Sequence, residues 1–216
     1  MSVSKTIVIS CAGMGTRLGI GSTKALIDID GKPLIIRQLE LLKDFDDIRI
    51  VVGYQMEKVI EVVNSYRKDI LFVFNHNYRN TGTGGSFSLA IKHAADMVVS
   101  LDGDLLVHPD DLRRVLDSDK ECVCGAIPCT EDPMLMKTLT QNGQIYGVGF
   151  SREEGEYEWT GLAQVKTARL TPGDHHVCDM MVPLLPLPME LIRTKEIDTM
   201  ADYEHAVAWV KSGYAD

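Results

Sequence analysis

Residues 6–19 read Thr6-Ile7-Val8-Ile9-Ser10-Cys11-Ala12-Gly13-Met14-Gly15-Thr16-Arg17-Leu18-Gly19. The first five residues are mostly β-branched and predict a short buried strand, which a glycine-containing loop follows directly. In that loop Gly13 and Gly15 permit a close approach of the backbone, so that successive N–H groups can converge on an anion. Arg17 adds a forked and permanent positive charge. The stretch predicts a phosphate-binding loop at the end of a strand, with a turn that is rich in glycine for steric reasons as the alternative.

The glycine spacing excludes two common nucleotide-binding loops. No Gly-x4-Gly-Lys-[Ser/Thr] sequence follows the strand, so the loop is not a Walker A motif. The spacing Gly13-x-Gly15-x-x-x-Gly19 is one residue longer than the dinucleotide fingerprint. The kind of ligand therefore has to be inferred from the residues that surround the loop.

Short strand-like runs alternate with segments of helical periodicity along the chain. The predicted strands lie at residues 6–10, 48–52, 70–74, 97–101, 122–127, 145–150 and 160–165. The predicted helices begin at Pro33 and Met56, lie around residues 87–94, run from Pro109 to about Leu116, and begin after Thr199 with Asp202 in a capping-box position. This alternation predicts an α/β protein with a single-domain, three-layer, Rossmann-like fold and a mainly parallel mixed sheet over residues 1–216.

Composition limits the classes of partner. The 216 residues include 22 Lys and Arg against 31 Asp and Glu, and the formal net charge of −9 disfavours nucleic acid because a phosphate backbone would be repelled. No uncharged run approaches the roughly 18 residues of a membrane span. The five cysteines stand at irregular spacings, which is typical of a reducing compartment. We therefore expect a cytoplasmic protein with neither nucleic acid nor membrane as a partner.

The first loop and the residues after it resemble the signature of the nucleotidyltransferase superfamily that activates sugar phosphates and phospho-alcohols. The resemblance is carried by Ala12-Gly13-Met14-Gly15-Thr16-Arg17-Leu18, then Lys24, then Gly31-Lys32-Pro33-Leu34. The family pattern is A-G-x-G-x-R-[LM], then P-K, then G-[KR]-P-[LM], and Thr23 stands here where proline is usual. The resemblance implies a nucleotide-binding part at about residues 1–110 and an acceptor-binding part at about 111–200 of the same domain.

Three later segments resemble the family in the same order. Gly82-Thr83-Gly84-Gly85-Ser86 resembles its loop beside the nucleobase, Leu101-Asp102-Gly103-Asp104 its metal motif, and Glu196-Ile197-Asp198-Thr199 its second metal aspartate. The implied nucleotide-binding residues are Ala12, Gly13, Met14, Gly15, Thr16, Gly82, Thr83 and Ser86. The implied catalytic cations are Arg17, on the β- and γ-phosphates, and Lys24, on the α-phosphate.

The reaction that the resemblance implies also sets the cofactor. An acceptor oxygen that is already anionic would attack the α-phosphorus, so charge is the main obstacle. Mg²⁺ needs only one or two protein carboxylates, and the resemblance implies Asp104 and Asp198 as its ligands. A simple turn and a helix cap are the alternative roles of these two residues. We expect Asp102 to support the site without binding the metal.

The expected acceptor site lies at residues 151–161. Residues 151–159 hold four glutamates and two aromatic residues, a composition typical of a cage for an amine or a quaternary ammonium group. A solvated hairpin tip is the alternative for Glu153 and Glu154. Glu158 and Trp159 are the expected contacts, and the resemblance implies Gly161 as a glycine on the acceptor side.

The interpretation that joins these observations is a Mg²⁺-dependent enzyme that transfers CMP from CTP to a phosphocholine-like compound and releases pyrophosphate. The segments EWTG and EIDTMADYEHA resemble the phosphocholine-type cytidylyltransferases. The alternatives are a sugar-1-phosphate nucleotidyltransferase that uses UTP, GTP or dTTP, a nucleotide-sugar glycosyltransferase, and a regulatory homologue without catalysis. The expected partners are a nucleoside triphosphate and a small phosphorylated acceptor, with a homodimer left open.

Overall fold

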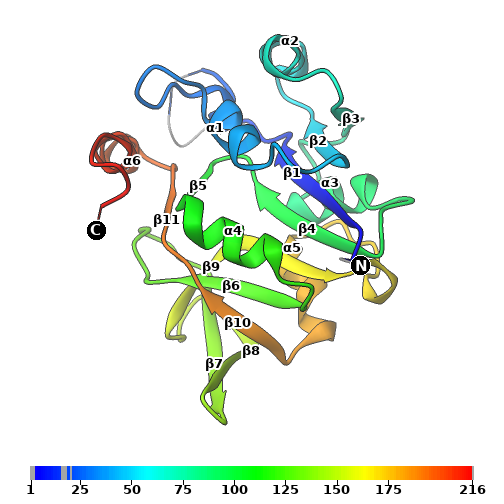
Figure 1. The fold of residues 1–216 in the computed structure, drawn as a ribbon, viewed down its shortest axis with the longest axis vertical. Coiled ribbons are helices and arrows are strands. Elements are labelled where there is room, and N and C mark those ends of the chain that lie inside the picture. Colours follow the sequence, from blue (N-terminus) through cyan, green and yellow to red (C-terminus); the bar gives the residue numbers. More distant parts are fainter. Residues whose placement is uncertain (1–2, 16–18, 20, 216) are drawn as a thin grey trace.

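The computed structural model describes residues 3–15, 19 and 21–215, and it places a central sheet between helices (Figure 1). The strands are β1 (Lys5–Cys11), β2 (Ile48–Val52), β3 (Leu71–Phe74), β4 (Met97–Asp102), β5 (Leu105–Val107), β6 (Cys122–Ala126), β7 (Leu135–Gln141), β8 (Gln144–Ser151), β9 (Tyr157–Lys166), β10 (Leu187–Leu191) and β11 (Thr194–Glu196). The helices are α1 (Leu34–Leu41), α2 (Met56–Tyr66), α3 (Thr83–Ala90), α4 (Pro109–Asp117), α5 (Val177–Met181) and α6 (Met200–Lys211). Each predicted strand and helix is confirmed, with shifts at the ends.

Among the described residues the main sheet has the order β3-β2-β1-β4-β9-β6-β10-β8-β7. Strands β3, β2, β1 and β4 run parallel, so their carboxyl ends meet at one edge of the sheet. Strand β9 runs antiparallel to both of its neighbours, β4 and β6. The predicted mixed sheet is thus confirmed, and its parallel ladder belongs mainly to the half of the chain in which we expect the nucleotide.

The alternation of side chains along β1 divides the core between the two faces of the sheet. Ile7 and Ile9 are fully buried in one cluster with side chains from α1, α2 and α4. Val8, which points the other way, packs in a second cluster with α3 and α5. The helices therefore form two outer layers over one sheet, which is the predicted three-layer arrangement.

A small second sheet connects the middle of the chain to its C-terminal helix. Strand β5 follows directly after the end of β4, and β11 pairs antiparallel with it (Figure 1). Ile29, Leu106, Ile197 and Trp209 share a third buried cluster, in which α6 packs against this sheet. Helix α6 begins with the predicted capping box, a reciprocal pair of hydrogen bonds between Thr199 and Asp202.

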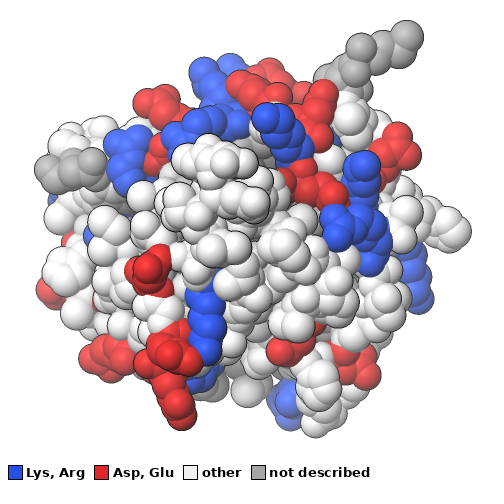
Figure 2. Space-filling model, turned by 90° about the horizontal axis from the view of Figure 1, so that it is seen from below, with Lys and Arg blue, Asp and Glu red and all other residues white. Residues whose placement is uncertain are grey.

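Several elements of the second half were not predicted, namely β5, β7, β10, β11 and α5. The last strand of the main sheet, β10, begins at Leu187 and pairs with β8 through Leu187 and Pro188. On the face shown in Figure 2, Lys and Arg side chains lie intermixed with Asp and Glu. Within the described part of the chain, no helix has the length and the apolar character needed to cross a membrane.

Candidate active site

Two adjoining cavities lie at the carboxyl ends of β1 and β4. The larger, which we call the main cavity, has a volume of about 530 Å³, and the smaller one has a volume of about 260 Å³. Both are lined by Ser10, Gly13 and Asp104, so the end of β1 and the turn after β4 separate them. Ligands of open parallel sheets bind at this edge, outside the carboxyl ends of the strands.

Most of the predicted site residues line these cavities. Those at the main cavity are Ala12, Gly13, Gly82, Thr83, Ser86, Asp104, Glu158, Trp159, Gly161 and Asp198. Those at the small cavity are Gly13, Gly15, Lys24 and Asp104. Met14 is described but is not among the residues that line either cavity, while Thr16 and Arg17 lie outside the described residues.

The amino end of α3 reaches the main cavity because segment 174–176 holds it there. The Gly82 N–H donates to the Asp174 carbonyl at 2.8 Å, and the Gly84 N–H donates to the His175 carbonyl at 3.0 Å. A Cβ built on Gly82 would lie 1.9 Å from the carbonyl oxygen of His175. The glycine is therefore required by this close packing, which sets Thr83 at the cavity wall.

Three carboxylates meet at the boundary of the two cavities. Asp104, Glu196 and Asp198 each offer an oxygen within 4.8 Å of the other two. The Lys24 ammonium lies 2.9 Å from an Asp104 oxygen and also donates to Asp198. The structure thus brings together the predicted lysine and both predicted metal aspartates, although they are separated by as many as 174 positions in sequence.

The charge balance of this cluster favours a bound cation. Burial, together with the charges of Asp104 and Asp198, raises the pKa of Glu196 to about 9. Burial lowers the pKa of Lys24, but the two aspartates outweigh it and raise the pKa above its usual value, so the lysine stays an ammonium ion. Carboxylate oxygens crowded in this way are the hard donors that Mg²⁺ prefers. The residues therefore fit a divalent cation, which would relieve their mutual repulsion.

Asp102 lies nearer to the site than we predicted. Strand β4 ends at Asp102, and a turn through Gly103 leads to Asp104. Both carboxylates line the main cavity. Burial and the charge of Asp104 raise the pKa of Asp102 to about 7.

Gly161 provides the space for the Asp102 carboxylate. Its φ is +76°, in the region that favours glycine, and a Cβ there would lie 2.1 Å from Oδ2 of Asp102. Strand β9 can therefore run beside β4 without displacing this acid. This explains the glycine that the sequence places after Trp159 and Thr160.

Glu158, which also lines the main cavity, anchors a loop. Its carboxylate accepts hydrogen bonds from the backbone N–H groups of Cys129 at 2.9 Å and Thr130 at 3.3 Å, and from the Thr130 hydroxyl. Trp159 is 9% exposed and packs edge-on against Phe150, with ring centroids 5.2 Å apart. Glu158 thus shapes the cavity through the loop, and Trp159 contributes mainly a wall.

Sequence reasoning missed several residues of the site. Glu196 could have been found, because it stands two positions before Asp198 and alternate residues of an extended chain share a face. Asp132, Met134, Arg152 and His176 also line the main cavity. Nothing in their spacing marks them, since long-range pairing of the second half of the sheet brings them to the cavity.

A parallel sheet edge that carries a glycine loop, a buried lysine and a carboxylate cluster suits a phosphate-bearing ligand and a divalent cation. The chain belongs to the family described as the MobA-like NTP transferase domain, whose model matches residues 7–184.

The chain is also similar to part of a longer curated protein. The bifunctional protein GlmU of Aliarcobacter butzleri is 29% identical over 156 residues, which are 71% of this chain and 36% of that protein. GlmU of a Sulfurovum species is 29% identical over 188 residues, 86% of this chain and 42% of that protein. The chain thus spans about two fifths of the length of these relatives.

Two solved structures share the fold over nearly the whole chain. The CTP:phosphocholine cytidylyltransferase of Streptococcus pneumoniae superposes with a TM-score of 0.73 at 20% identity, covering 96% of this chain and 100% of that one. The inositol-1-phosphate CTP transferase of T. maritima superposes with a TM-score of 0.74 at 18% identity, covering 100% and 99%. At these identities the likeness establishes the fold alone.

Proposed function

We propose that the protein is a Mg²⁺-dependent cytidylyltransferase that transfers CMP from CTP to a phosphocholine-like phospho-alcohol or phosphonate. The observation that carries the proposal is the convergence of Lys24, Asp104, Glu196 and Asp198 where the two cavities meet. One positive and three acidic side chains at such a junction suit a reaction in which a triphosphate and a second anion must be held together.

The reaction is a substitution at phosphorus. An oxygen of the acceptor phosphate forms a bond to the α-phosphorus of CTP, and the bond from that phosphorus to the oxygen bridging to the β-phosphate breaks. Pyrophosphate leaves with the electron pair, and no proton has to be removed from the attacking oxygen. The Lys24 ammonium would hold the α-phosphate, since it lies at the small cavity beside the glycine loop. Mg²⁺ held by Asp104, Asp198 and Glu196 would neutralise charge on the phosphate oxygens.

The acceptor would lie beside Glu158 in the main cavity. The acidic groups Asp132 and Glu158 and the walls made by Met134 and Trp159 suit a small molecule whose other end is a cation. Arg152, which pairs with Asp132 at 3.0 Å, adds one positive charge for the acceptor phosphate. Two of the structural neighbours act with CTP by their names, which supports cytidine as the base.

A sugar 1-phosphate with another nucleotide is the second candidate. A Bacillus anthracis protein assigned as a glucose-1-phosphate thymidylyltransferase superposes with a TM-score of 0.75 at 17% identity, covering 96% of each chain. Its likeness in fold equals that of the two CTP-dependent proteins. The choice of base and acceptor is therefore a matter for assay.

Pyrophosphate release with Mg²⁺ tests the proposal. The four ribonucleoside triphosphates and dTTP would each be paired with phosphocholine, phosphoethanolamine, aminoethylphosphonate and glucose 1-phosphate. We expect the highest kcat/KM for CTP with an acceptor that carries an amine or a quaternary ammonium group. Pyrophosphate release only with a sugar phosphate would favour the second candidate. No pyrophosphate release with any pair would contradict both candidates.

Replacing Glu158 with glutamine should weaken acceptor binding specifically. The amide keeps one acceptor oxygen for the N–H donors of residues 129 and 130 but loses the negative charge, and loss of charged hydrogen bonds costs roughly 1.5–3 kcal/mol. We expect the KM for the acceptor to rise roughly tenfold or more while the KM for CTP stays within twofold. Glu153→Gln, an exposed glutamate of the same segment, is the matched control. An unchanged acceptor KM in Glu158→Gln would argue against this role.

A further inference from the structure

Strand β11 carries one of the three cation-site carboxylates, Glu196, and a second, Asp198, follows two residues after the strand ends, yet the strand belongs to a very small sheet. Among the described residues it pairs only with β5, in the register Thr194 with Val107, Lys195 with Leu106 and Glu196 with Leu105. An isolated two-stranded ribbon is at best marginally stable in water. Helix α6 packs against this ribbon, and the position of Glu196 depends as well on what fixes the two ends of the ribbon.

One end of the ribbon is the cation site itself. The Ile197 N–H donates to the Asp104 carbonyl at 3.2 Å, directly beyond the pair formed by Glu196 and Leu105. A slip of one residue would turn the Glu196 side chain to the other face of the ribbon, because side chains alternate along a strand. It would also move Asp198 relative to Asp104. The register of β11 thus sets the geometry of the three carboxylates.

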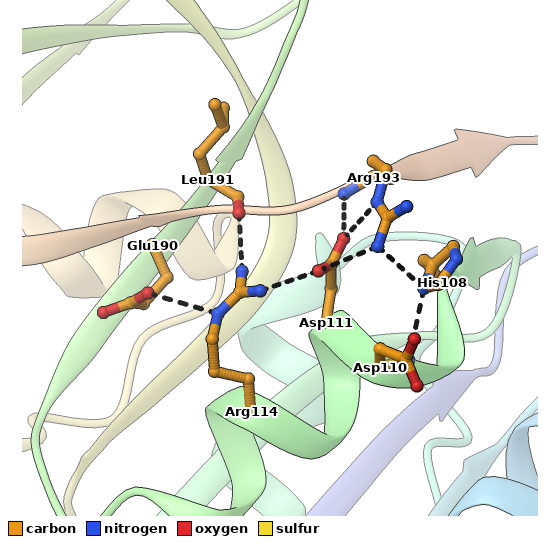
Figure 3. Close-up of polar contacts among 7 residues, drawn as sticks. All are labelled: His108, Asp110, Asp111, Arg114, Glu190, Leu191 and Arg193. Carbon is orange, nitrogen blue, oxygen red and sulfur yellow. Dashed lines mark hydrogen bonds and ion pairs between the residues drawn. The ribbon is translucent and has the colours of Figure 1, made fainter. Parts of the chain in front are cut away.

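The other end of the ribbon is fixed by a polar cluster on α4 (Figure 3). The Arg193 N–H donates to Oδ2 of Asp111 at 2.9 Å, and the Nε of Arg193 donates to the same oxygen at 2.8 Å. The Arg193 carbonyl accepts from the N–H of His108 at 3.0 Å. Nη2 of Arg193 also lies 3.1 Å from Nδ1 of His108. Backbone and side chain of Arg193 are both bound immediately before β11 begins.

Asp111 is built into the fold as a fixed anion. It is 4% exposed, at the first turn of α4. Burial would raise the pKa of its carboxyl group, but the hydrogen bonds from Arg193 and Arg114 outweigh burial and lower the pKa to about 2. Arg114 binds the other oxygen at 2.7 Å and reaches toward β10 through the Leu191 carbonyl, as Figure 3 shows. A buried carboxylate of this kind holds its partners in defined positions.

We propose that Asp111 and Arg193 are positioning residues that fix the register of β11 and so hold Glu196 and Asp198 in place for the divalent cation. The proposal rests on the cation site of the proposed function. Neither residue lines the described cavities, and each would act only through the strand that follows Arg193.

Direct binding of Mn²⁺ to the free protein tests this role without an assay of turnover. Electron paramagnetic resonance of free Mn²⁺ would be recorded with wild type, Asp111→Asn and Arg193→Lys. Outer groups that orient metal ligands typically contribute 10- to 100-fold in affinity, so we expect the dissociation constant to rise roughly tenfold in both variants. Arg193→Lys keeps the charge at a partly exposed position and removes only the hydrogen bonds that the guanidinium group donates to Asp111. It therefore tests the proposal even if Asp111→Asn does not fold.

Arg114→Gln is the matched control. It removes the other arginine that binds Asp111, but its remaining contacts go to β10, and it does not touch β11. We expect its Mn²⁺ affinity to stay within twofold of wild type. If wild type binds Mn²⁺ and all three variants bind it equally tightly, the positioning role alone is overturned. Absence of wild-type binding would instead overturn the cation site, and the positioning role with it.

Amide hydrogen exchange provides a readout that involves no metal. The amide of Ile197 should exchange at least tenfold faster in Asp111→Asn and Arg193→Lys than in wild type and in Arg114→Gln. Amides of α2 should be unchanged. Exchange at Ile197 that is equal in all four proteins would contradict the proposal even if metal affinity falls.

Discussion

Replacing Asp104 with asparagine is expected to lower kcat roughly 100- to 1,000-fold. The substitution removes one charge from the carboxylate cluster and one of the two partners of the Lys24 ammonium. Losing a metal ligand at a reacting phosphate should cost several kcal/mol of charge stabilisation, and about 1.4 kcal/mol corresponds to each factor of ten in rate. Asp198→Asn should behave in the same way. Pyrophosphate release at saturating substrates and Mg²⁺ measures both variants.

A surface carboxylate provides the control for this experiment. Asp44→Asn changes the net charge equally at an exposed position outside the two cavities, and we expect its kcat to remain within a factor of two. The fold of each variant would be checked by its thermal transition. An Asp104→Asn enzyme that is folded and turns over at half the wild-type rate or more would show that Asp104 is no metal ligand.

Replacing Gly82 with alanine is expected to destabilise the protein by about 2–3 kcal/mol and to weaken nucleotide binding. The added Cβ would meet the carbonyl oxygen of His175 at 1.9 Å and its carbon at 2.5 Å. Both are backbone atoms, so no change of rotamer relieves the overlap, and forced shifts of this kind cost roughly 1–3 kcal/mol or more. Either α3 or segment 174–176 must move, which displaces Thr83 from the cavity wall. Urea unfolding and the KM for CTP measure the two effects.

Gly149→Ala is the matched control for steric packing. A Cβ at Gly149, on β8, meets no atom within 4 Å, and the backbone there needs no positive φ. We expect its stability to lie within about 0.5 kcal/mol of wild type, as is usual for surface substitutions. If Gly82→Ala were as stable as Gly149→Ala, the close packing of α3 on segment 174–176 would be wrong.

The parallel half of the fold could be predicted because its signals are local. Strands β1, β2 and β4 are apolar runs between helices with clear periodicity, and each was found at nearly its observed bounds. The second half is harder, because its strands are stabilised by distant partners. Strand β10 contains Pro188, which usually argues against a strand, and β11 has three half-buried residues that only its pairing with β5 makes recognisable.

The candidate site could be predicted where its residues belong to motifs that follow one another in the family order. Lys24, Asp104 and Asp198 were named from the sequence, and the structure brings them together. Glu196 was missed because one aspartate was sought on that segment. The place of Asp102 at the cavity depends on Gly161 of β9, which pairs with β4 from a distant part of the chain, so no local pattern indicates it.

The most direct test of the central claim follows the phosphorus atoms. The protein would be incubated with Mg²⁺, phosphocholine and CTP labelled with ³²P at either the α or the γ position. The account predicts that α-label appears in the organic product and that γ-label appears in pyrophosphate. Transfer of γ-label to the acceptor, or release of γ-label as inorganic phosphate with no labelled organic product, would contradict nucleotidyl transfer at this site.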